Sequence, residues 1–145
     1  EECKAVAGLL EKYSDISIAK SYRYSLLAMV ALIEKDRDVI NKCIEEMETL
    51  VSQSPEMYIR EAYRVISKYP AMLDAEENGD YAKMSELLEL DDAKTFTLKK
   101  VSANYRLYKV ATVAGLEEEA AKHRGYVIEN GGDTFYKKEL EVANQ

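Results

Sequence analysis

Apolar residues recur at spacings of three and four along nearly the whole chain, which is the period of an amphipathic helix. Turn and capping signals divide this pattern, because Asn78-Gly79-Asp80 ends one helix and begins the next. The Tyr69-Pro70 pair predicts a bend or break within a third long element. The predicted helices cover residues 2–13, 17–34, 36–51, 56–73, 81–90, 93–114, 116–129 and 134–142.

Short connections between successive long helices make neighbours antiparallel, so the pattern predicts a series of αα-hairpins. The second helices of these hairpins begin near residues 36, 79 and 116, which gives spacings of 43 and 37 residues. Units of this size stack into helical solenoids because one hairpin cannot bury its own apolar face. A compact, irregular helical bundle is the alternative, and the uneven spacing favours it.

Residues 77–88 have the sequence Glu-Asn-Gly-Asp-Tyr-Ala-Lys-Met-Ser-Glu-Leu-Leu, which resembles the turn and second helix of a tetratricopeptide repeat. Residues 115–120, together with 126–130, resemble the same half-repeat. The resemblance implies an all-α fold, namely an αα-hairpin solenoid. This would be a tetratricopeptide-like right-handed superhelix of about three hairpins with a helical cap at each end.

Composition agrees with one acidic helical domain. The chain has 145 residues, 47% of them hydrophobic and 32% charged, which is enough apolar material for a core. Only two prolines and six glycines are present, too few for the many tight turns of an all-β fold. The longest uncharged stretch, residues 24–33, is half of a membrane span, so we expect no membrane contact by this segment.

The first residues already belong to an amphipathic pattern, and no basic region or apolar signal segment precedes them. We therefore expect residues 1–145 to be a single helical-repeat domain that is a fragment of a longer chain. The missing part could be an anchor, a secretion signal or another domain. This interpretation leaves the cellular compartment open.

Charge is unevenly distributed along the sequence. Residues 17–33, 56–73 and 93–115, the predicted first helices, together carry a formal charge of +8, whereas the rest carries −15 within a net charge of −7. The net charge excludes a general nucleic-acid binder. In tetratricopeptide solenoids the first helices line the concave face, so the resemblance implies a basic inner face and an acidic outer one.

A basic face with interleaved tyrosines suits an extended acidic peptide or a terminal carboxylate. Arg60, Arg64 and Lys68 recur every four residues, and Lys100 and Asn104 are also four apart, so each set predicts one stripe of a helix. The alternative is that these basic residues are solvated and neutralised by acidic neighbours. The candidate ligand-binding residues are Arg60, Tyr63, Arg64, Lys68, Lys100, Asn104 and Tyr105.

The sequence holds no pattern for catalysis or metal binding. His123 is the only histidine, and Cys3 and Cys43 lack the paired spacing of zinc ligands. A histidine phosphotransfer module would have lysine and glycine three and four residues after the histidine, where Tyr126 and Val127 stand. We therefore interpret His123 as a helix-surface residue, and expect no enzyme activity, no cofactor and no metal.

These observations predict a non-catalytic scaffold domain that binds a protein or peptide on a basic, tyrosine-rich concave face. The alternative is a structural or self-associating helical domain of a larger protein, which could be membrane-anchored. In that case an apolar surface near the start of the chain packs on a second copy and forms a homodimer.

Overall fold

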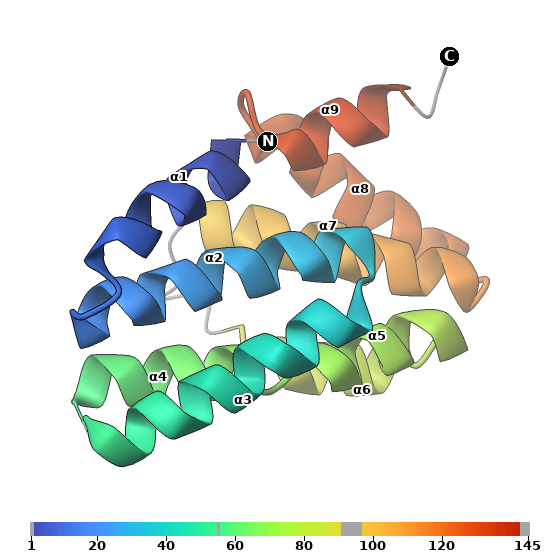
Figure 1. Ribbon diagram of the computed structural model, residues 1–145. Helices are drawn as coiled ribbons and strands as arrows, with labels where there is room; N and C mark the ends of the chain where they lie inside the picture. Colours follow the sequence, from blue (N-terminus) through green and yellow to red (C-terminus); the bar gives the residue numbers. More distant parts are fainter. Residues whose placement is uncertain (1, 55, 91–96, 143–145) are drawn as a thin grey trace. The chain divides into compact units, whose positions relative to one another are not determined.

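The computed structural model describes residues 2–54, 56–90 and 97–142, and these residues form helices and no strands (Figure 1). The all-α prediction is therefore confirmed, while the superhelical stacking of hairpins stays a prediction. The helices are α1 (Glu2–Leu10), the short 3-10 helix η1 (Glu11–Tyr13), α2 (Ser17–Glu34), α3 (Arg37–Gln53), α4 (Met57–Ile66), α5 (Tyr69–Asn78), α6 (Tyr81–Leu88), α7 (Thr97–Val113), α8 (Glu117–Asn130) and α9 (Phe135–Val142).

The chain divides into two compact units, residues 1–73 and residues 74–145, and the division falls inside α5. In the first unit, α1 packs on α2, and α2, α3 and α4 pack on one another. In the second unit, α7 packs on α6, α8 and α9. Helices that follow one another in the chain thus pack together from α1 to α4 and from α6 to α9.

Local signals set the helix boundaries in the first unit. Helix α2 ends at Glu34, and Lys35 after it takes a left-handed conformation with φ 59°. The Asp36 side chain then accepts a hydrogen bond from the Val39 amide and caps the start of α3. The core lies between α2, α3 and α4. Its buried residues are Ala28, Cys43, Met47, Leu50, Ile59 and Ile66.

The break near Pro70 lies earlier than the sequence predicts. Helix α4 ends at Ile66, and Pro70 is the second residue of α5. Proline is tolerated in the first turn of a helix because an amide there has no intrahelical acceptor. Pro70 therefore helps to begin a new helix and does not bend a continuing one.

In the second unit, the turn at Asn78-Gly79-Asp80 forms as the sequence predicts. Gly79 has φ +65°, and the Asp80 side chain accepts a hydrogen bond from the Lys83 amide, which caps α6. A cluster from three helices forms a core in this unit. Its buried members are Val101, Tyr105, Val127 and Leu140.

Candidate functional site

The seven residues predicted to bind a ligand fall into both units. Arg60, Tyr63 and Arg64 lie on α4, and Lys68 follows that helix, all in the first unit. The other three, on α7, belong to the second unit; they are Lys100, Asn104 and Tyr105. Because these residues belong to two units, a single groove built from all seven stays a prediction.

On α4 the predicted residues differ in exposure. Arg60 and Arg64 are exposed, and the Arg64 Nε donates to Glu61 Oε2 at 3.0 Å. Tyr63 is half-buried and packs against the core of the first unit. The two arginines are accessible to a partner, whereas the ring of Tyr63 contributes to folding.

On α7 the predicted residues are engaged within the second unit. Tyr105 is buried, and its hydroxyl donates to Glu139 Oε2 of α9 at 2.5 Å. Burial, followed by this hydrogen bond, raises the pKa of Tyr105 well above its usual range. The Asn104 Nδ2 donates to the Lys100 carbonyl at 2.8 Å. Asn104 and Tyr105 therefore have structural roles within this unit.

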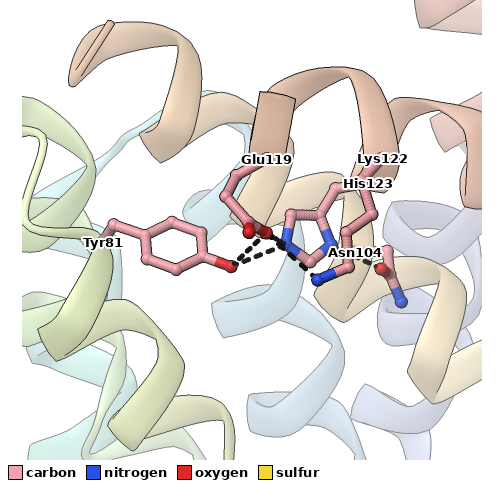
Figure 2. Close-up of polar contacts among 5 residues, drawn as sticks. All are labelled: Tyr81, Asn104, Glu119, Lys122 and His123. Carbon is pink, nitrogen blue, oxygen red and sulfur yellow. Dashed lines mark hydrogen bonds and ion pairs between the residues drawn. The ribbon is translucent and has the colours of Figure 1, made fainter. Parts of the chain in front are cut away.

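The structure corrects the surface assignment of His123, because the residue is only 6% exposed. Figure 2 shows its polar contacts with residues of three helices. Its Nδ1 lies 2.7 Å from the Asn104 Oδ1 of α7, and its Nε2 lies 2.7 Å from the Tyr81 hydroxyl of α6. One turn earlier on α8, Glu119 Oε2 lies 3.1 Å from the Tyr81 hydroxyl and accepts from Lys122 Nζ at 3.1 Å. The network joins three helices of the second unit.

The environment of His123 favours the neutral imidazole. Burial lowers the pKa of His123, the Lys122 ammonium lowers it further, and the Glu119 carboxylate opposes both effects. In the neutral form Nδ1 donates to Asn104, and the Nε2 lone pair faces the Tyr81 hydroxyl. The Tyr81 hydroxyl has a single proton, and its two acceptors, His123 Nε2 and Glu119 Oε2, compete for it.

The first unit has an open groove between α2 and α4, which we call the α2–α4 groove. Its volume is about 240 Å³. At its edge, the rings of Tyr22 and Tyr58 lie with their centroids 5.1 Å apart. The lining residues are Ser25, Tyr58, Glu61, Ala62, Val65, Ile66 and Tyr69.

The groove exists because α4 carries apolar residues on more than one face. Ile59 and Ile66 are buried in the core, whereas Tyr58 and Val65 stay 41% and 44% exposed. The spacing of positions 58, 62, 65 and 69 is a helical stripe that could have been read in the sequence. Periodicity alone does not tell which of two apolar stripes meets a neighbouring helix, and so the sequence analysis missed this surface.

Other site types find no support in the described residues. Among residues 2–54, 56–90 and 97–142, no group of three or more histidine, cysteine or acidic residues is placed to hold a metal ion. Within the same part of the chain, no helix combines the length and apolar character needed to cross a membrane.

A scan of the chain against protein-family models finds no match, and searches of curated proteins and of solved structures find none either. The resemblance of residues 77–88 to a tetratricopeptide half-repeat therefore stays a prediction.

Proposed function

We propose that the chain is a non-catalytic protein-interaction domain that holds a peptide segment of a partner in the α2–α4 groove. The observation that carries the proposal is the groove itself, an open apolar surface with tyrosine rings at its edge. A concave apolar surface gives an apolar side chain of a partner more contacts than a flat surface does.

The dimensions of the groove favour a side-chain anchor over a small molecule. Pockets for small ligands commonly enclose about 300–1,000 Å³ and bury most of the ligand. The α2–α4 groove, at about 240 Å³, is smaller and open to solvent. An apolar or aromatic side chain projecting from a peptide suits this space, because such anchors dominate protein interfaces.

A buried hydroxyl in the groove gives a second reason. The Ser25 Oγ is buried and has no hydrogen-bond partner within the described part of the chain. Burying a polar group without a partner costs free energy, so the hydroxyl is a point at which a bound peptide gains a hydrogen bond. Peptide backbone carries both donors and acceptors, and either can pair with a serine hydroxyl.

The charges on α4 favour an acidic partner. Arg60 and Arg64 are one turn apart and exposed on the helix that forms one wall of the groove. A peptide whose apolar residue enters the groove could place carboxylates beside these guanidinium groups. The proposal therefore keeps the predicted acidic peptide but uses α4 alone as its basic surface.

The test is a selection of random phage-displayed peptides on the full chain, followed by fluorescence anisotropy of an enriched synthetic peptide. Val65→Asp places a carboxylate in the groove wall and should weaken binding by at least about tenfold. Val39→Asp on α3, where Val39 is 36% exposed, is the matched control and should leave the affinity unchanged. Equal binding by wild type and Val65→Asp, or no enriched peptide, would contradict the proposal.

Two further variants separate the contributions. Ser25→Ala should lower the affinity for the peptide by about three- to tenfold. The free protein should become no less stable, because the removed hydroxyl has no partner there. The double variant Arg60→Glu with Arg64→Glu should lower the affinity for acidic peptides by about tenfold or more at low salt, and by less at high salt. Lys42→Glu with Lys99→Glu makes the same charge change at other exposed positions and serves as the control.

A further inference from the structure

The outward face of α1 and η1 carries an apolar stripe that the proposed function does not use. Val6, Leu9 and Tyr13 are 46%, 58% and 55% exposed, and their spacings of three and four place them on one side of the helix. Ala7 is the buried residue of α1. The larger apolar side chains therefore face solvent.

Ion pairs hold α1 against α2 in a defined orientation. Lys4 Nζ lies 2.6 Å from Glu34 Oε1 at the end of α2, and Arg23 of α2 lies 3.2 Å from Glu11 Oε1. These pairs tie opposite ends of the α1–η1 segment to the same neighbouring helix. These ion pairs therefore orient the apolar stripe toward solvent.

The charges at the ends of this stripe are complementary to one another. Glu2 begins the segment and Lys12 lies near its end, and both side chains are exposed. Two copies packed antiparallel would bring Glu2 of each copy close to Lys12 of the other. A parallel arrangement would place like charges together, which destabilises an interface.

We propose that two copies of this chain associate through antiparallel packing of their α1 helices about a two-fold axis. The axis passes between Val6 and Leu9, so that Val6 of one copy meets Leu9 of the other. Such an interface contacts itself through the same patch on both subunits.

The expected dimer is weak. One short helix from each copy buries less than the roughly 1,000 Å² that a stable interface needs, so association should depend on protein concentration. The surface is distinct from the α2–α4 groove, and therefore either proposal can fail without the other.

The test is sedimentation velocity of the full chain over a wide range of protein concentration. The wild-type sedimentation coefficient should rise with concentration, and Leu9→Glu should weaken association by at least about tenfold. Leu98→Glu changes a leucine that is 62% exposed on α7 and is the matched control. A wild type that stays monomeric, or a Leu9→Glu variant that associates as well as Leu98→Glu, would overturn the proposal.

Charge exchange tests the antiparallel orientation. Lys12→Glu should weaken the dimer because it places two acidic groups together, and the double variant Glu2→Lys with Lys12→Glu should restore it. A purely structural role of Lys12 would give no such restoration. Association that is lost in Leu9→Glu but not restored in the double variant would rule out the antiparallel arrangement.

Discussion

The Asn104 Oδ1 lies 2.7 Å from the His123 Nδ1, and this contact determines which imidazole nitrogen carries a hydrogen. The Asn104 Nδ2 already donates to the Lys100 carbonyl, so the oxygen faces the ring and can only accept. The Nδ1 must therefore donate, and the Nε2 is left for the Tyr81 hydroxyl. An amide on α7 thus orients the histidine of α8 toward α6.

Tyr81→Phe should destabilise the protein, because it removes the hydroxyl that contacts His123 and Glu119 while keeping the ring. We expect the free energy of unfolding to fall by about 1–2 kcal/mol, measured by urea denaturation. Tyr126→Phe on α8 is the control, since that hydroxyl makes no hydrogen bond in the described part of the chain. Equal stability of Tyr81→Phe and wild type would show that the network contributes little.

Acidification from about pH 7.5 to about pH 5.5 should destabilise the protein, a range centred near the ordinary histidine pKa of 6.5. The pKa of His123 is lowered in the folded state, so the unfolded chain binds the proton more readily as the pH falls. The contribution of His123 to stability is thus fully present above the ordinary pKa of 6.5. It is lost as the pH falls from there through the lowered pKa of the folded state. Urea denaturation at several pH values measures the change.

The groups facing His123 allow the effect to be assigned. Asn104 does not titrate, Tyr81 has a raised pKa, and Glu119 has a lowered pKa, so neither of the last two changes charge in this range. His123→Gln should remove most of the pH dependence of the free energy of unfolding. If this free energy changes with pH as steeply in the variant as in wild type, other groups cause the effect.

Gly79→Ala and Gly125→Ala should have opposite effects on stability. Gly79 has φ +65°, and a Cβ there would lie 3.1 Å from the Ala114 backbone, so alanine should cost at least about 1–2 kcal/mol. Gly125 lies inside α8 with open space around it, and alanine should add about 0.5–1 kcal/mol. Thermal unfolding of both variants measures the contrast, and two changes of the same sign would contradict this account of the turn.

Cys3 and Cys43 should differ in reactivity. Burial raises the pKa of Cys43 to about 11, and the side chain lies in the core of the first unit, whereas Cys3 is half-buried on α1. Iodoacetamide near neutral pH should therefore modify Cys3 first, with one adduct by mass spectrometry in the native protein and two in urea. Two adducts forming at equal rates in the native protein would show that the core opens readily.

The helices could be predicted from local signals. The bounds of α2, the start of the next helix near Asp36 and the turn at Gly79 depend on residues within one helical turn of each boundary, and the structure confirms them. The break lies between Ile66 and Tyr69, earlier than predicted from Pro70. Proline favours the first turn of a helix as strongly as it opposes a helix interior.

The surroundings of side chains could not be predicted in the same way. His123 matches no metal or phosphotransfer pattern and is therefore interpreted from the sequence as a surface residue, yet Val127 one turn later is fully buried on the same face. The partners of the His123 ring, Tyr81 and Asn104, are 42 and 19 residues away from it in the sequence. Which polar groups meet inside a helical unit depends on how helices cross, and periodicity does not contain that information.

The attachment of α1 has a consequence for how the protein opens. This helix buries only Ala7 fully, and both ion pairs that hold it to α2 are partly solvated. Its detachment therefore requires far less free energy than unfolding of the core that α2, α3 and α4 share. Amide hydrogens of α1 should exchange with solvent ahead of those in that core. Because a dimer needs α1 in place, self-association would slow this exchange, so the breathing of one helix and the assembly of two chains are linked.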